Sequence, residues 1–216
     1  MFIGHFAAGF AAKKIDKRPS LGTLFMAAQF LDLLWPLLLL FGIERVEIDP
    51  GNTALTPLNF VYYPFTHGLF GALIWSVLFG GIYYLIRKNM KTAILMGGLV
   101  LSHWLLDLIV HRPDLPLFPW SDIKVGLGLW NSVFWSVLLE SILFITGVWL
   151  YFKATKAKNK KGQIGLWALI IFLGIVYTMN IFGPPPPDTG PVAILGLSQW
   201  LLIAWAYWID RNRISI

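Results

Sequence analysis

Long apolar runs separated by short charged segments make up most of the 216-residue chain. A helix needs about 20 residues to cross the hydrocarbon core of a bilayer, and several of these runs approach or exceed that length. The runs predict about six transmembrane helices, at residues 21–43, 60–86, 92–111, 126–152, 164–183 and 191–209. Residues 1–12 are also apolar, but they are too few to span and predict a short N-terminal half-length helix. The expected fold class is therefore an all-α integral membrane protein.

A proline interrupts the first predicted span. Pro36 should kink this helix, because proline cannot donate the helical hydrogen bond and its ring clashes with the carbonyl four residues earlier. That carbonyl belongs to Asp32. The kink is thus expected to leave backbone oxygen beside a carboxylate inside the membrane.

Composition supports the membrane class. Hydrophobic residues make up 57% of the chain and charged residues only 13%, whereas a soluble domain carries about twice that share of charge. There is no cysteine, which excludes disulfides and thiolate metal ligands. We expect one polytopic membrane domain over residues 1–216, in which residues 1–115 carry the motifs and residues 116–216 complete the bundle.

Basic residues gather in alternate connecting segments, and the chain has a net charge of +6. Fourteen of the 17 lysines and arginines lie in residues 13–18, 87–91, 153–161 and 211–213. The positive-inside rule places these segments in the cytoplasm, which predicts a multi-pass inner membrane protein with both termini cytoplasmic. This topology accounts for the charge without nucleic acid, so the expected partners are membrane lipids. The pattern does not set an oligomeric state.

Three ionisable residues recur every four positions in the third predicted span: His103, Asp107 and His111. On an α-helix this spacing places the three side chains in one narrow stripe. A histidine and a carboxylate one turn apart can hold the same cation. A single histidine on an apolar face is more often a hydrogen-bonded core residue, but three groups in register within an apolar helix favour a site.

Other ionisable groups lie within the predicted apolar segments: His5, Asp32, His67 and Glu140. Counted along their helices, they fall with the stripe between the midplane and the outer interface, so they could converge. Such groups cost a few kcal/mol or more each in a bilayer and persist mainly where they pair, bind ions or line a cavity. A metal site is favoured, with a metal-free proton relay or structural network as the alternative. Tyr63, one turn before His67, is expected to hydrogen-bond substrate unless it belongs to an aromatic belt.

Short motifs follow one another over residues 1–115: Gly4-His5, Asp32, Thr66-His67-Gly68, and Ser102-His103 followed by Asp107. Their order resembles that of the bacterial membrane-bound metal-dependent hydrolases, a family distantly similar in ligand order to the zinc-dependent phospholipase C fold. The resemblance implies five metal ligands: His5, Asp32, His67, His103 and Asp107. The chain lacks two features that members commonly show, a second acid beside the position of Asp32 and an Arg-Gly before the Thr-His.

Depth and spacing, rather than the resemblance, add His111 as a further ligand. They also add Asp114 and Glu140, which join Asp107 as candidate catalytic carboxylates. Nitrogen and oxygen ligands without sulfur suit one or two Zn²⁺ ions, and also Mn²⁺ or Fe²⁺. The nucleophile would be a water activated by the metal, and a spare carboxylate would be the general base.

The expected function is a membrane-embedded metal-dependent hydrolase that acts on a lipid phosphoester or ester near the outer half of the bilayer. One alternative is a proton- or ion-coupled transporter that uses the same ionisable cluster. Another is an inactive membrane scaffold with a structural metal. Serine nucleophile elbows and phosphate-binding glycine loops are excluded, since neither G-x-S-x-G nor G-x-x-x-x-G-K-[ST] occurs in the chain.

Overall fold

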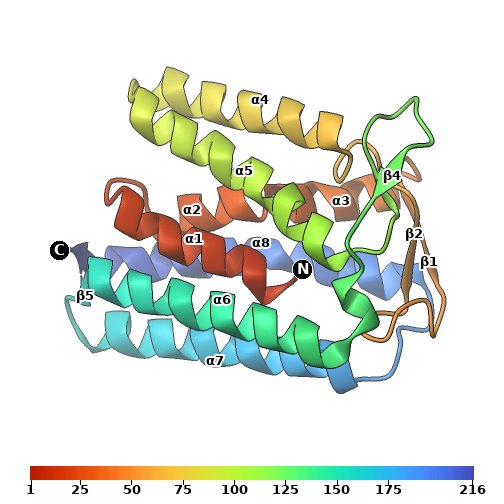
Figure 1. The fold of residues 1–216 in the computed structure, drawn as a ribbon. Coiled ribbons are helices and arrows are strands. Elements are labelled where there is room, and N and C mark those ends of the chain that lie inside the picture. Colours follow the sequence, from red (N-terminus) through yellow and green to blue (C-terminus); the bar gives the residue numbers. More distant parts are fainter.

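The structure, a computed structural model that describes residues 1–216, is a bundle of helices that lie roughly along one axis (Figure 1). The helices are α1 (Ile3–Ile15), α2 (Leu21–Ala28), α3 (Phe30–Leu40), α4 (Leu69–Arg87), α5 (Met90–Val110), α6 (Val133–Ala154), α7 (Lys160–Phe182) and α8 (Thr189–Arg211). Helices α4 to α8 are long enough to cross a membrane, with mean hydropathy between 1.6 and 2.1. Helices α2 and α3 form a further candidate span, bent by 57°. The predicted all-α membrane fold, with about six spans and a half-length first helix, is confirmed.

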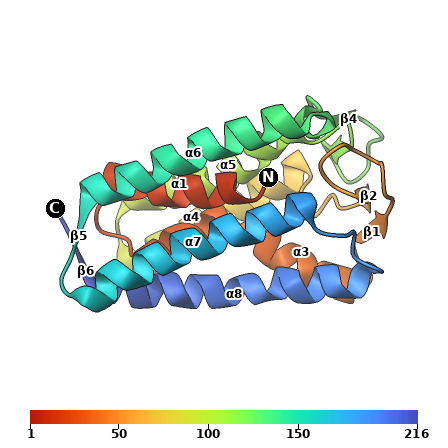
Figure 2. The ribbon, with the colours of Figure 1, turned by 90° about the horizontal axis from the view of Figure 1, so that it is seen from below.

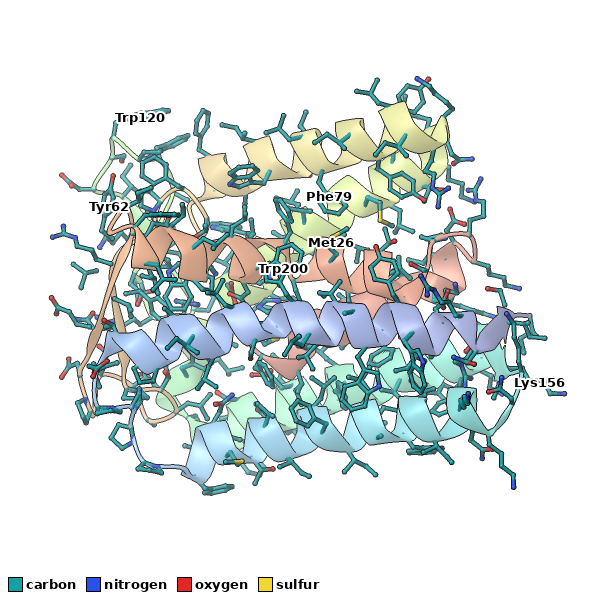
Figure 3. All side chains as sticks on the ribbon, turned by 180° about the vertical axis from the view of Figure 1, so that it is seen from behind. Met26, Tyr62, Phe79, Trp120, Lys156 and Trp200 are labelled. Atoms are coloured by element: carbon teal, nitrogen blue, oxygen red, sulfur yellow. The ribbon has the colours of Figure 1, made fainter.

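Short strand pairs connect the helices at the two ends of the bundle. The strands are β1 (Arg45–Ile48), β2 (Leu58–Tyr62), β3 (Leu115–Pro116), β4 (Lys124–Val125), β5 (Thr155–Ala157) and β6 (Arg213–Ser215). They form three separate antiparallel pairs, β1 with β2, β3 with β4, and β5 with β6. The β1–β2 hairpin marks one end, which we call the hairpin end (Figure 1). The four basic segments lie at the opposite, basic end, where Figure 3 labels Lys156, whereas Tyr62 and Trp120 lie at the hairpin end.

The short helix α1 lies in the interior of the bundle, beside α2 and α6 (Figures 1 and 2). Phe10 is fully buried, and its ring meets that of Phe25 in α2 edge-on at 4.7 Å. Gly147 lets α6 approach closely, since a Cβ there would lie 2.4 Å from the carbonyl oxygen of Ala7. Small residues at such contacts are typical of helix packing in membranes. The packing holds His5 of α1 inside the protein.

The bend of 57° in the first span lies at Gln29, seven residues before Pro36, so the break in this span is not the kink predicted at Pro36. Pro36 lies within α3 and packs against α8, where a Cβ on Gly196 would lie 2.4 Å from the proline Cγ. The break has a tertiary reason. The carbonyl oxygen of Ala28, the last residue of α2, accepts a hydrogen bond at 2.9 Å from the ring of His103 in α5.

The second span begins at Leu69, later than the sequence predicts, because residues 58–62 form β2. Pro64 disfavours helical geometry at the residue before it. The side chain of Glu44 then accepts hydrogen bonds from the backbone N–H groups of Phe65 and Thr66, at 2.8 and 2.9 Å. His67 consequently lies in the loop before α4 and not inside a span.

The fourth span is also shorter than predicted. Residues 126–132 are not α-helical, and η1 (Leu129–Asn131) is a single turn of 3-10 helix. Gly126 and Gly128 have φ of +155° and +75°, backbone conformations that favour glycine and end any regular helix. Helix α6 begins after Ser132, whose side chain accepts a hydrogen bond from the N–H of Trp135.

Candidate metal centre

Histidine and aspartate side chains from four segments meet between the middle of the bundle and its hairpin end. They form two overlapping groups, one of His5, His103 and Asp107 and the other of Asp32, His67 and His103. Within each group the candidate ligand atoms lie within 4.8 Å of one another. Four of the five residues are buried, and the side chain of Asp32 is 20% exposed. The structure therefore brings together the five residues that the resemblance implies as ligands; we call them the His/Asp cluster.

Helix α5 supplies the central pair of the cluster, since His103 and Asp107 are one turn apart on the same face. The Nε2 atom of His103 lies 3.3 Å from Oδ2 of Asp107 and 3.6 Å from Oδ1 of Asp32. The Nε2 atom of His5 lies 3.1 Å from Oδ1 of Asp107, and that of His67 lies 3.3 Å from Oδ1 of Asp32. Each carboxylate thus faces more than one imidazole nitrogen.

A hydrogen-bonded chain orients His67. Its Nδ1 atom donates to the hydroxyl of Thr66 at 2.8 Å, and this hydroxyl donates to Oε2 of Glu44 at 2.6 Å. Glu44 is buried, and burial raises the pKa of its carboxyl group above the ordinary value although Thr66 and Phe65 donate hydrogen bonds to it. With Nδ1 engaged, the Nε2 atom of His67 points to the cluster. Metal-binding histidines usually have such a partner on their other nitrogen.

His103 is oriented in the same way by the break between α2 and α3. Its Nδ1 atom donates to the carbonyl of Ala28, which leaves Nε2 directed at the two carboxylates. This buried Nε2 atom has no hydrogen-bond partner, and neither has Nδ1 of His5. An unsatisfied buried polar atom costs about 1–3 kcal/mol.

The cluster fits a divalent metal ion. Neutral imidazole nitrogens and carboxylate oxygens are the ligands that Zn²⁺, Mn²⁺ and Fe²⁺ accept. The unpartnered Nε2 atom of His103 is shared by both groups, so it is the donor best placed to gain from an ion. In this structure the amino group of Met1 donates to Oδ1 of Asp107 at 2.6 Å.

His111 and Asp114 lie outside both ligand groups and form a cluster of their own. The Nδ1 atom of His111 lies 3.0 Å from Oδ1 of Asp114, and the Tyr63 hydroxyl donates to the same oxygen at 2.9 Å. Burial would raise the pKa of Asp114, but hydrogen bonds from His111, Tyr63 and Arg112 lower it below its ordinary value. Burial and the neighbouring carboxylate raise the pKa of Tyr63 well above its usual range. The predicted roles of His111 as ligand, Asp114 as base and Tyr63 as substrate contact stay predictions.

Glu140 reaches the region from α6. Its Oε2 atom accepts hydrogen bonds from the backbone N–H groups of Phe2 and Gly4, at 2.9 and 3.1 Å, and the residue is buried. Both bonds involve the same oxygen, so the carboxylate holds the start of α1 while its Oε1 atom is left for another partner. Glu140 thus adjoins the His/Asp cluster without belonging to either ligand group.

A cleft of about 690 Å³ opens onto the cluster. Its polar floor consists of Asp32, His67, Asp107, His111 and Glu140. Its walls are formed by the connection between β1 and β2, the end of α7, the proline-rich loop at 183–187 and the start of α8. Figure 2 shows this loop next to the β1–β2 hairpin. Tyr63 and Asp114 do not line the cleft.

Sequence reasoning missed the residues that position the ligands. Glu44 lies in a charged connecting segment, and nothing in the sequence pairs it with Thr66, 22 residues away. Thr66 was noticeable only as the neighbour of His67. The carbonyl of Ala28 carries no side-chain signal at all.

A family model described as YdjM inner membrane protein matches residues 2–183. This match includes every residue of the His/Asp cluster, together with His111, Asp114 and Glu140. Neither a search of curated proteins nor a search of solved structures finds a match. The description of the family states a location and no activity. The apolar helices and the family match agree that this is a multi-pass inner membrane protein, and the chain belongs to the YdjM inner membrane protein family.

Proposed function

We propose that this protein is a metal-dependent hydrolase whose substrate is held in the membrane. The observation that carries the proposal is the convergence of His5, Asp32, His67, His103 and Asp107 beside one cleft. Three of them, Asp32, His67 and Asp107, form part of its floor. Ionisable residues within a bilayer are costly and mark functional sites by default. Here they come from segments far apart in the sequence, and their nitrogen and oxygen donors face one another.

The His/Asp cluster would hold one or two divalent ions, with Zn²⁺ the best fit and Mn²⁺ or Fe²⁺ as alternatives. When bound, such an ion lowers the pKa of a water molecule and stabilises negative charge that develops on a substrate oxygen. The surrounding residues of the chain would orient the ligand side chains. Glu44 and Thr66 fix the ring of His67, and the carbonyl of Ala28 fixes the ring of His103.

Carboxylates beside the cluster are the candidates for proton transfer. Glu140 lines the cleft, and both backbone hydrogen bonds to it fall on Oε2, so its other carboxylate oxygen is the candidate to accept a proton from water or substrate. Asp107 lies on the floor of the cleft but is engaged with histidines. Asp114 contacts the cleft only through His111, whose ring it would hold in place.

A lipid phosphoester or ester suits the cleft better than a free polar metabolite. Apolar residues of α7 and α8 form one of its walls, and their neighbours on the outer face of the bundle, such as Phe182 and Ile194, are exposed in positions that would face lipid. A polar head could therefore reach the cluster while an acyl chain stays among these helices. The cleft lies at the end away from the basic segments, so the positive-inside rule favours the outer half of the membrane for the cleft and the cytoplasm for the C-terminus. The predicted cytoplasmic N-terminus does not fit this arrangement, because the amino group of Met1 lies inside the bundle against Asp107.

A transporter that uses the same cluster would need a polar route to the basic end of the bundle. Between the two ends lie the fully buried rings of Phe6, Phe10 and Phe25. These aromatic contacts favour a closed floor and hence hydrolysis over transport.

The test measures metal content and hydrolysis together. Protein purified in mild detergent without chelator would be analysed for zinc, manganese and iron, and assayed on a fluorogenic lipid phosphoester and a fluorogenic lipid ester. A double variant, His103→Ala with Asp107→Ala, is expected to lose both the metal and any activity. A matched double variant outside the ligand groups, His111→Ala with Asp114→Ala, should keep the metal.

Two results would count against the proposal. Parent protein with less than about a tenth of an equivalent of metal, even after metal is added, would exclude the metal site and favour a proton relay. Metal that is bound and lost in the first variant, with no hydrolysis of either lipid, would favour a scaffold with a structural ion.

A further inference from the structure

A second pocket, of about 380 Å³, lies at the basic end of the bundle. It is lined by Arg18 before α2, by Arg87 at the end of α4, and by Arg211 at the end of α8. We propose that this basic pocket binds a phosphate group, the chemistry shared by phospholipid headgroups and soluble phosphate compounds. The site is separate from the His/Asp cluster and does not depend on the proposed hydrolase activity.

The arginines have donors to spare. Arg87 and Arg211 are exposed, and neither forms a salt bridge within the chain. Arg18 donates from Nε and Nη2 to the carboxylate of Asp16, at 2.9 and 2.7 Å, which leaves its Nη1 atom free. The planar guanidinium group presents paired N–H donors that match phosphate oxygens. Three such groups around one pocket form a strong anion site.

Hydroxyl groups line the same pocket and complete the donor set. The hydroxyls of Ser20 and Thr23 lie 2.9 Å apart, and that of Thr23 lies 2.9 Å from the Tyr207 hydroxyl. A row of hydroxyls can orient its protons so that a terminal O–H donates to an anion. The Tyr83 hydroxyl, also in the lining, makes no hydrogen bond within the chain.

The one carboxylate in the lining is already compensated. Asp210 lies 3.4 Å from Nζ of Lys13, and the Tyr151 hydroxyl donates to it at 3.5 Å. A second carboxylate nearby, Asp16, is occupied by Arg18 and by the hydroxyl of Thr92. The pocket therefore keeps a positive balance that a phosphate would neutralise.

Topology alone does not require this arrangement. The positive-inside rule is satisfied by exposed lysines anywhere in a connecting segment, and Lys156 and Lys160 at the same end are of this kind. The arginines instead come from three segments and surround a hollow with hydroxyls. Arg87 and Arg211 are the last residues of two candidate spans, a depth at which lipid headgroups lie.

The experiment titrates the purified full-length protein with three probes and follows its unfolding temperature. The probes are short-chain phosphatidylglycerol, inorganic phosphate, and the matching diacylglycerol, which lacks the phosphate. The test variant combines Arg87→Gln with Arg211→Gln. The control variant combines Lys156→Gln with Lys160→Gln, which removes the same charge at the same end without touching the pocket.

Phosphate recognition predicts that the test variant binds at least about tenfold more weakly than the parent and the control variant, because charged hydrogen bonds are lost. Diacylglycerol should show no such difference. If phosphatidylglycerol binds and inorganic phosphate does not, the ligand is a lipid; if both bind alike, a soluble phosphate compound is the source. Equal binding by parent and test variant, or an equal loss in the control variant, would overturn the proposal. Retained size and unfolding temperature without ligand establish that the test variant is folded.

Discussion

At the hairpin end of the bundle, His103 and Asp107 are buried and face partners from three other segments, whereas at the basic end Arg87 and Arg211 are exposed and have no carboxylate partner. Charge inside a membrane protein is tolerated only with compensating groups around it. A charged side chain exposed to water needs no compensating group, because water solvates it and an exposed ion pair contributes at most about 1 kcal/mol. The difference shows what each region can do: the His/Asp cluster needs the whole fold to exist, while the basic pocket is built from side chains that are free to meet a ligand.

The largest effect is expected for the histidine that both ligand groups share. His103→Ala should abolish metal binding and lower hydrolysis at least about 100-fold, because it removes a donor from each group. His5→Ala and His67→Ala each remove a donor from one group. If the centre holds two ions, elemental analysis should find about one equivalent in each of these variants. Phosphate binding at the basic end should be unchanged in all three. Full metal content in the His103 variant would mean that the ion lies elsewhere.

Replacing a threonine by valine at each end of the bundle compares the His/Asp cluster with the basic pocket directly. Thr66→Val removes the hydroxyl that links His67 to Glu44, and metal affinity should fall by about 10–100-fold, as expected for loss of an orienting partner. Thr23→Val removes a hydroxyl of the basic pocket and should weaken phosphate binding only a few-fold, about the value of one neutral hydrogen bond. Metal titration and phosphate titration of both variants check this. A loss of metal in the Thr23 variant would contradict the independence of the His/Asp cluster and the basic pocket.

A smaller effect is expected for Tyr63, which lies outside the His/Asp cluster and contacts Asp114. Tyr63→Phe removes a donor to Asp114 but no group of the His/Asp cluster, so metal content should stay unchanged while hydrolysis falls by about three- to tenfold. Comparison of kcat and KM distinguishes positioning from direct contact. A rise in KM alone would indicate that the hydroxyl touches substrate, as the sequence suggested.

The smallest effect is expected for an ion pair at the basic end. Hydrogen bonds from Arg18 lower the pKa of Asp16 below its ordinary value, against the opposing effect of burial. Its contribution to stability is therefore present at pH values above the unfolded pKa, about 3.9, and is lost only as the pH falls through the lower folded value. Asp16→Asn should cost about 1 kcal/mol, because Arg18 is half exposed but Asp16 is buried and also accepts a hydrogen bond from Thr92, with a constant difference in Tm between pH 8 and pH 5. A difference that vanished within this range would contradict the assigned pKa direction.

The five residues of the His/Asp cluster were predictable because charge stands out in an apolar sequence. Asp32 is the only ionisable residue of its span, so its presence there called for a partner. The order of short motifs then supplied the grouping. Nothing of this kind marks the positioning residues: Glu44 lies in a segment that also contains Arg45 and Glu47, where a carboxylate is ordinary.

The regular spacing of His103, Asp107 and His111 was a less reliable guide, because spacing predicts a shared face only while the helix continues. Helix α5 ends at Val110, and His111 has an extended backbone with ψ of 145°. Its ring consequently joins Asp114 and not the His/Asp cluster. In the same way the apolar run at 60–86 concealed a strand, since Phe60 and Tyr62 suit a buried strand as well as a helix.

The interior position of α1 also sets an order of assembly. This helix carries His5, yet it is too short to span and packs against α6, whose Gly147 lies 142 residues further along the chain. During synthesis α1 has no such neighbour until α6 leaves the ribosome and enters the membrane. The His/Asp cluster is therefore completed late in biogenesis, because a nascent chain that ends before α6 contains His5 but lacks the helix against which α1 packs.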